Sequence, residues 1–309
     1  MTKFIIRRFL GIFPTLFIIV SISFFLIRAA PGGPFDTEKA IPAEVLVNIE
    51  AKFHMDEPLV VQYGRYMYDI LRGDLGPSFR YPDHDVNYFI ANSFPISIQL
   101  GTISIVLALI LGISTGIISA LRQNTWIDYS TMGIAIIGIS IPTFVVGPIL
   151  MYFLAMKLHW LPTSGWITGR HGYVTLIMPV ITLSLPFYAY FARISRASII
   201  EVLRSDYIRT ARAKGLSGPV IIIKHVLKGA MLPVVSFLGP ALAGILTGSV
   251  VIEKIFRIPG LGKFFVQSAF NRDYTIIMGT VIVYAVMLVV LNFIVDIVYS
   301  FLDPRIAYK

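Results

Sequence analysis

Residues 97–120 read SIQLGTISIVLALILGISTGIISA and contain no charged side chain. About 20 consecutive apolar residues cross the hydrocarbon core of a bilayer as an α-helix. Lipid offers no hydrogen-bond partner to backbone N–H and C=O groups, so a spanning segment must be a helix or part of a closed barrel. This run is far longer than a barrel strand and does not alternate, so it predicts a transmembrane helix.

Apolar blocks of similar length recur along the chain. The chain is 56% hydrophobic and 14% charged, whereas soluble domains have about 45–50% apolar and about 25% charged residues. We therefore predict an all-α, polytopic membrane protein with about six transmembrane helices. The other five predicted spans are 9–28, 130–156, 174–194, 231–252 and 275–301.

The first apolar block has the basic start of a signal peptide. Its apolar run, however, is longer than a normal signal core, and Arg28 lies where a cleavage site requires small neutral residues. We expect residues 1–29 to remain as an N-terminal transmembrane helix.

Basic residues gather on one side of the predicted spans. Cytoplasmic loops of membrane proteins are enriched in Lys and Arg, which explains the net charge of +9 better than binding to nucleic acid does. We therefore expect both termini to be cytoplasmic. The residues on this side are Lys3, Arg7, Arg8, Arg122, Arg193, Arg196, Arg204, Arg209, Arg212, Lys214, Lys224, Lys228, Arg305 and Lys309.

The other side carries a long first loop rich in Asp and Glu. Residues 30–93 form an external accessory segment in this interpretation, with helical spacing over Ala43–Phe53 and Val60–Leu71. Residues 94–303 form the membrane core.

Several function classes have no support in the sequence. There is no cysteine, no H-E-x-x-H or G-x-S-x-G motif, no phosphate loop and no metal-ligand spacing of histidines. We expect neither a catalytic residue nor a bound metal or cofactor.

Acids within the spans are scarce. Asp296 lies near the cytoplasmic end of its span, where we favour an ion pair with Arg8 or Arg305, and Glu253 ends a span on the outer side. A carrier driven by ions usually needs buried acids along its path, so the energy for any transport is expected from a separate ATPase.

The cytoplasmic segment 201–235 reads EVLRSDYIRTARAKGLSGPVIIIKHVLKGAMLPVV. Ser205 and Asp206 favour the start of a helix, and Gly215 favours its end in a left-handed conformation, with Leu216 folding back. Ser217-Gly218-Pro219 then opens a second helix. The short helix between these breaks could dock on a partner protein or lie on anionic lipid, and its residues alone do not decide between the two.

This segment resembles the EAA loop of ABC importer permeases, which has two small residues, a glycine four residues on and then Leu-Pro. Arg209-Thr210-Ala211 stands at the EAA position and Gly215 at its glycine. Arg209 replaces the usual Glu, and Leu232-Pro233 lies five residues beyond the general spacing. Both departures are typical of the oligopeptide/dipeptide/nickel branch.

Other motifs of that branch extend the resemblance over nearly the whole chain. They are FIIRRFLGIFPTL at 4–16, GDLGPS at 73–78, FRIPGLG at 256–262, NRDY at 271–274 and DPR at 303–305.

The resemblance implies the type I ABC importer permease fold in a bacterial cytoplasmic membrane, with a coupling loop over about 195–230. It also implies a second permease, two cytoplasmic ATPase subunits that bind ATP and Mg, and an external peptide-binding protein as partners, with membrane lipid around them. The residues implied for coupling to an ATPase are Arg209, Thr210, Ala211, Gly215 and Leu216.

The substrate stays open between oligopeptides, which the likeness of the external segment favours, and dipeptides or nickel. A transporter that works alone is the alternative from another class, and no substrate-contacting residue can be named.

Overall fold

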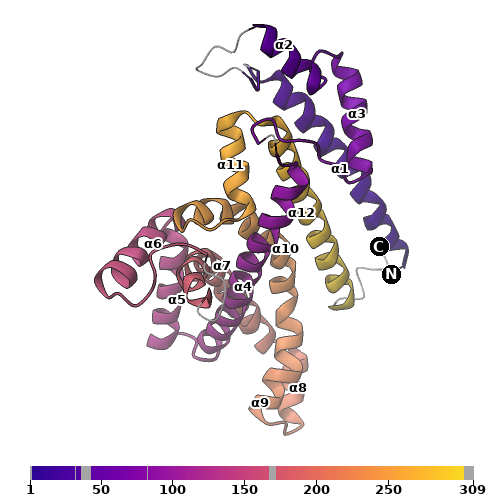
Figure 1. Ribbon diagram of the computed structural model, residues 1–309. Helices are drawn as coiled ribbons and strands as arrows, with labels where there is room; N and C mark the ends of the chain where they lie inside the picture. Colours follow the sequence, from indigo (N-terminus) through magenta and orange to yellow (C-terminus); the bar gives the residue numbers. More distant parts are fainter. Residues whose placement is uncertain (1, 32, 36–42, 82, 167–171, 303–309) are drawn as a thin grey trace.

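The computed structural model describes the whole chain except residues 1, 32, 36–42, 82, 167–171 and 303–309. The described residues form helices joined by loops (Figure 1). In chain order these are α1 (Thr2–Ala29), α2 (Ala43–Lys52), α3 (Leu59–Leu71), α4 (Val86–Leu121), α5 (Trp126–Ser140), α6 (Thr143–Leu150), the π-helical η1 (Met151–Lys157), α7 (Gly172–Leu203), α8 (Asp206–Ala213), α9 (Gly218–Val220), the π-helical η2 (Ile221–Val226), α10 (Leu227–Ile255), α11 (Leu261–Asn271) and α12 (Tyr274–Leu302).

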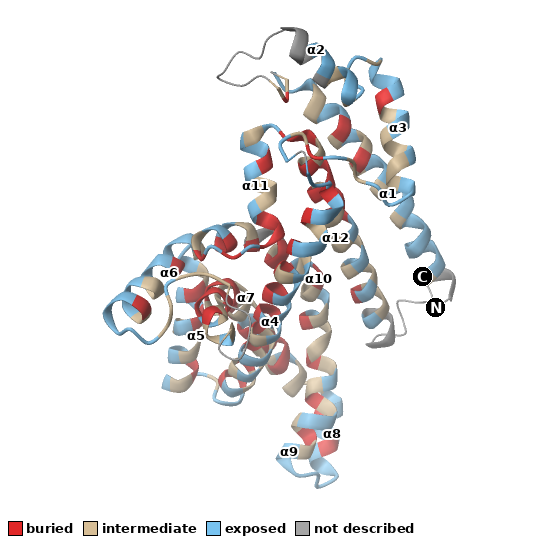
Figure 2. Ribbon diagram, in the orientation of Figure 1, coloured by how far each residue is buried: buried red, intermediate tan, exposed pale blue. Residues whose placement is uncertain are grey.

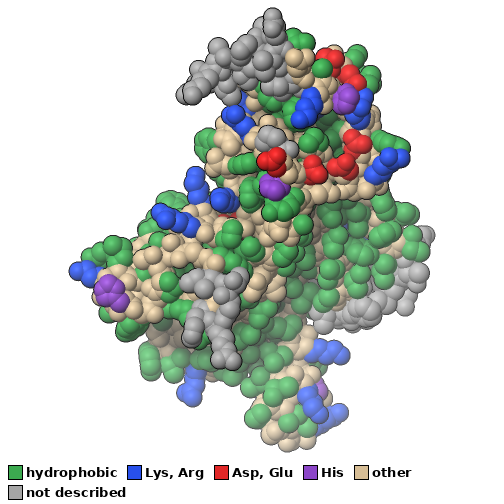
Figure 3. All heavy atoms as spheres, in the orientation of Figure 1, with side chains coloured by type: hydrophobic (Ala, Val, Ile, Leu, Met, Phe, Trp, Pro, Cys, Tyr) green, Lys and Arg blue, Asp and Glu red, His purple; other side chains and the backbone are tan. Residues whose placement is uncertain are grey.

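Among the described residues the helices include five candidate membrane spans, or six if one bent pair is counted as a span, which confirms the all-α polytopic prediction. Five helices are individually long and apolar enough, and the bent pair formed by α5 and α6–η1 makes the sixth. In Figure 1 α2, α3 and α11 lie at one end of the molecule, and α8 and α9 lie at the other. Charged side chains gather toward these two ends, and a broad apolar surface lies between them (Figure 3).

The third span is not the single helix predicted over 130–156. The chain bends by 104° between Ser140 and Thr143. Proline disfavours the α conformation in the residue before it, and Ile141, which precedes Pro142, is extended with φ −96° and ψ 120°. The break therefore follows from Pro142, whereas Pro148 lies inside α6.

The helices on either side of α8 are longer than the predicted membrane spans. A continuous helical span runs from Gly218 to Ile255, which confirms the helix start predicted at Ser217-Gly218-Pro219. The predicted membrane span 231–252 covers only the later part of this helix. Val226, Ala230 and Val234 are all buried and lie four residues apart on one face. This stripe continues past Pro233 because packing compensates for the backbone hydrogen bond that proline removes.

The core of the membrane domain is centred on the contact between α4 and α7, where buried residues concentrate (Figure 2). A Cβ added at Gly112 would lie 2.6 Å from the Cβ of Phe191, and one at Gly116 would lie 2.5 Å from the Cβ of Ser195. These two glycines therefore allow α4 and α7 to approach closely.

The two helices predicted in the external segment are present as α2 and α3. α3 packs on the outer end of α1, where Tyr63 and Tyr66 contact the ring of Phe24. The Arg28 guanidinium lies 3.6 Å from the centroid of the Phe24 ring. Burial raises the pKa of the Tyr66 hydroxyl above its usual value, and the charge of Arg28 opposes this rise.

We predict that Gly116→Val destabilises the protein by about 1–3 kcal/mol, because the new side chain overlaps α7. Gly133→Val is the matched control, since a Cβ at Gly133 in α5 meets nothing within 4 Å. Thermal unfolding of the detergent-purified variants measures the difference. Equal midpoints for the two variants would contradict the close packing of α4 on α7.

Candidate functional site

The helix α8 has the ends that the sequence predicts. Ser205 occupies the N-cap position, although its side chain makes no capping hydrogen bond and instead donates to the Val202 carbonyl at 2.6 Å. At the other end Gly215 has φ +77°. The backbone N–H of Gly215 donates to the Arg212 carbonyl, and that of Leu216 donates to the Ala211 carbonyl. These two bonds form a Schellman motif.

The inner face of α8 packs against other helices of the same chain. Ile208 is fully buried and Ala211 is 5% exposed. They pack in one cluster with Ala120 of α4, Ile199 of α7 and buried residues of η2 and α10. The resemblance to the EAA loop implies Ala211 as one of the residues that couple to an ATPase. The structure directs Ala211 inward, because α8 needs an apolar face to hold it against the long helices.

The outer face of α8 is open at the end of the molecule (Figure 2). Arg209 pairs with Asp206 at 3.1 Å, but both side chains remain more than 70% exposed. Leu216 is 40% exposed and Ile223 of η2 is 67% exposed. Thr210, Arg212, Lys214 and Gly215 are exposed as well. This surface therefore combines positive charge with exposed apolar side chains.

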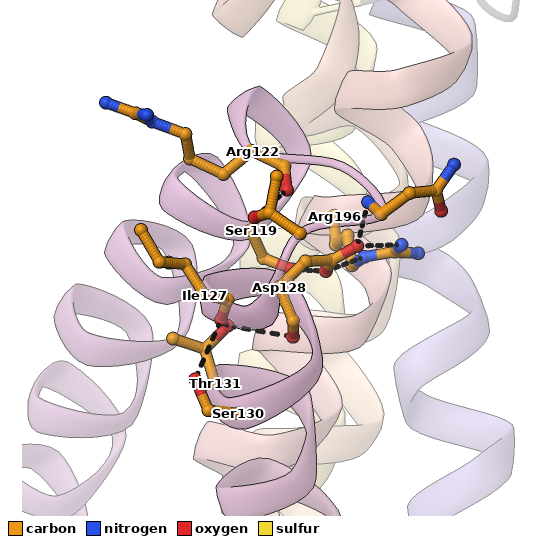
Figure 4. Close-up of polar contacts among 9 residues, drawn as sticks. Ser119, Arg122, Ile127, Asp128, Ser130, Thr131 and Arg196 are labelled. Atoms are coloured by element: carbon orange, nitrogen blue, oxygen red, sulfur yellow. Dashed lines mark hydrogen bonds and ion pairs between the residues drawn. The ribbon is translucent and has the colours of Figure 1, made fainter.

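A buried ion pair lies beside the α8 cluster and joins three helices (Figure 4). Arg196 of α7 donates from Nε and Nη2 to the two carboxylate oxygens of Asp128 in α5, at 2.7 and 2.6 Å. Asp128 also accepts from the Ser119 hydroxyl of α4 and from the backbone N–H of Asn124 at 3.0 Å. We call Ser119, Asn124, Asp128 and Arg196 the Asp128 cluster.

The Asp128 cluster fixes the turn between α4 and α5. Asn124 has φ +62°, a left-handed conformation that asparagine tolerates better than most residues. Ser119 is followed directly by Ala120, which contacts the α8 cluster. The sequence places Arg196 only among the basic residues of the cytoplasmic side and does not pair it with Asp128. The one signal that could have found the pair was an isolated acid in the first turn of an apolar block.

Glu253 has a structural role at the opposite end. It is fully buried at the end of α10. Its Oε1 accepts from the Ser97 hydroxyl at 2.6 Å, and its Oε2 accepts from the backbone N–H of Gly262 at 2.8 Å. The carboxylate thus caps the N-terminus of α11. A Cβ at Gly260 or Gly262 would collide with it. These glycines permit close approach, and neither has the positive φ of a tight turn.

A second buried carboxylate joins two of the motifs at this end. Asp273 accepts from the Ser78 hydroxyl at 2.6 Å and from the backbone N–H of Ile276 at 3.1 Å. It therefore holds the external segment against the start of α12.

Asp296 forms the predicted ion pair with Arg8 at 3.3 Å. Arg305, the alternative partner, lies outside the described residues. A search for metal ligands among the described residues finds no group of three His, Cys, Asp or Glu side chains able to hold an ion.

We predict that Asp128→Asn destabilises the protein by about 2 kcal/mol, because Arg196 loses its charged partner. Arg196→Gln should have a smaller additional effect in the Asp128→Asn background than alone. Thermal unfolding of both single variants and the double variant measures this coupling. If the destabilisations of the two single variants simply add in the double variant, the interaction between Asp128 and Arg196 contributes nothing to stability.

Two family models match the chain. Residues 1–101 match the N-terminal part of the binding-protein-dependent transport system membrane component, and residues 112–308 match the binding-protein-dependent transport system inner membrane component. Among solved structures, the inward-facing MetNI methionine ABC transporter has a chain that superimposes with a TM-score of 0.58 at 17% identity, covering 70% of this chain and 97% of that one. This likeness shows a shared fold.

Curated relatives match from end to end. The oligopeptide transport system permease protein OppB of Escherichia coli K12 is 50% identical over 308 residues, and that of Haemophilus influenzae is 48% identical, with 100% of both chains covered in each case. The dipeptide permease DppB of Bacillus subtilis is 44% identical over 99% of this chain and 98% of its own. The chain thus belongs to the family of binding-protein-dependent transport system inner membrane components, as a non-catalytic, multi-pass permease subunit of an ABC importer.

Proposed function

We propose that this permease forms part of the pathway for oligopeptide uptake. The observation that supports the substrate is the 50% identity with oligopeptide permeases, which runs through the whole chain including the external segment. A permease for a different substrate class would be expected to diverge where the chain meets its external binding protein.

The partners follow from the family's mechanism. Membership of a binding-protein-dependent ABC family implies an ATPase and a binding protein. We propose the specific assembly of this chain with a homologous second permease, two ATPase subunits and a peptide-binding protein. ATP and Mg would bind to the ATPase subunits.

The outer face of α8 is the proposed contact with an ATPase. Arg209, Thr210, Gly215 and Leu216 are exposed there, and the charge with the exposed apolar side chains suits a protein groove. Ala211 would act indirectly, since it anchors α8 to α7 and α10. Motion of the ATPase would reach the membrane through these two long helices.

The division into an N-terminal helix (1–29), an external segment (30–93) and a membrane core (94–303) remains part of this proposal. The pathway would be lined by α4, α5, α6, α7 and α10, together with the second permease. Dipeptide uptake is the second candidate, because the Bacillus subtilis dipeptide permease is 44% identical. A nickel importer of the same branch is a further alternative.

We predict that Gly215→Asp abolishes transport while the protein still inserts. The substitution places a negative charge on the docking face. A Cβ at Gly215 meets nothing within 4 Å, and Asp tolerates the left-handed conformation of this position (φ +77°) better than most residues, so the protein should still fold. Co-purification of the ATPase subunits and peptide uptake at equal membrane abundance measure the effect.

Two controls separate charge from backbone strain. Gly215→Asn has nearly the same shape and no charge. Gly73→Asp has a similar φ of +80° and open space, but lies in the external segment. Normal ATPase binding and uptake by Gly215→Asp would refute the docking assignment.

We also predict that peptide-loaded binding protein stimulates ATP hydrolysis by the reconstituted complex of two permeases and two ATPases. Tri- to pentapeptides should stimulate more strongly than dipeptides. Stimulation by dipeptides alone, or by a nickel-loaded binding protein, would keep the family and change the substrate. Failure to assemble with any ATPase would overturn the proposed partners.

A further inference from the structure

A groove of about 710 Å³ lies between α1 and α12. Its volume is within the range of about 300–1,000 Å³ typical of small-molecule sites. α1 and α12 run side by side (Figure 1) and touch through the rings of Phe9 and Phe293, 6.0 Å apart. The mechanism proposed above makes no use of this space.

One end of the groove is positively charged. Arg7 and Arg8 line it near the start of α1, and Asp296 is the single acid among its lining residues. Asp296 pairs with Arg8. Arg7 is exposed and forms no ion pair with any residue that the structure describes. The groove therefore keeps a net positive charge at its mouth.

The rest of the groove suits a hydrocarbon chain. Its walls are mostly apolar, with Ile12 of α1 and Leu288 of α12 among them. Gly11 also lines the groove, and a Cβ added there would meet nothing within 4 Å. The open space at Gly11 thus continues from the charged mouth along α1 toward the bilayer centre.

This order of charge and apolar surface matches the order within a phospholipid. The start of α1 lies on the side rich in Lys and Arg, which places the mouth at the cytoplasmic leaflet. Basic pockets between transmembrane helices on that side bind anionic headgroups. A phospholipid supplies both a negative charge for Arg7 and an apolar chain for the rest of the groove, and the comparison of isolated chain and assembled complex below distinguishes it from a docking protein helix.

We infer that the groove between α1 and α12 is a binding site for an anionic phospholipid of the cytoplasmic leaflet. The phosphate headgroup contacts Arg7 and Arg8, and one acyl chain lies over Gly11. The lipid completes the packing of α1, whose main contact with the other helices is α12.

The test uses the full-length chain in its importer complex, purified in a mild detergent and stripped of lipid. Phosphatidylglycerol or phosphatidylcholine is titrated in, and native mass spectrometry measures the lipid-bound fraction. We expect phosphatidylglycerol to bind several-fold more tightly. This preference should fall as salt rises from about 0.05 to about 0.5 M, because the headgroup contact is electrostatic.

Two variants test the two ends of the groove. Arg7→Gln should weaken phosphatidylglycerol binding about five-fold, the effect of one basic residue near an anionic surface, and leave phosphatidylcholine unchanged. Gly11→Phe should weaken binding of both lipids, since its ring fills the acyl-chain position.

Arg122→Gln and Gly133→Phe are the matched controls. Arg122 is a basic residue on the same side, at the end of α4, and Gly133 also has open space around it. Both variants should bind lipid like the unchanged protein.

Equal binding of the two lipids, or unchanged phosphatidylglycerol binding by Arg7→Gln, would overturn the inference. Binding to the isolated chain but not to the assembled complex would also overturn it, because the second permease would then be the occupant.

Discussion

A backbone N–H group that is buried away from water needs a hydrogen-bond acceptor, and this constraint governs how the chain interrupts its helices. At three interruptions a buried carboxylate supplies the missing acceptor. Asp128 accepts a hydrogen bond from a backbone N–H in the turn between α4 and α5. Glu253 accepts one from a backbone N–H in the first turn of α11. Asp273 accepts from the first turn of α12. Each acid also accepts a hydrogen bond from a serine hydroxyl of α4 or of the loop before it. All three helix interruptions are therefore linked to α4 or its preceding loop.

These contacts change how the few acids of the membrane region are understood. An intramembrane carboxylate is a candidate for ion transport by default. Asp128 is occupied by Arg196, Glu253 holds the end of a helix, and Asp296 pairs with Arg8. Their roles are structural in the described residues, which agrees with a permease whose energy comes from a partner protein.

Local features were predictable from the sequence, and contacts distant along the chain were not. The apolar blocks, the helices of the external segment and the glycine end of α8 each depend on neighbouring residues. By contrast, Arg196 and Asp128 are 68 positions apart, and Glu253 and Ser97 are 156 positions apart. Pro142 breaks its span while Pro233 lies inside a helix, where the buried stripe of Val226, Ala230 and Val234 continues past the proline. The inward direction of Ala211 likewise depends on the helices around it.

The attachment of α8 has a mechanical consequence. α8 lies between α7 and the helical span Gly218–Ile255 and shares a packed cluster with both. At about 1.5 Å per residue, the longer of these helical spans is roughly 55–60 Å long. A force applied to α8 would act on both helices together instead of bending a loop. A displacement at α8 would therefore be passed along both long helices toward the other side of the membrane core.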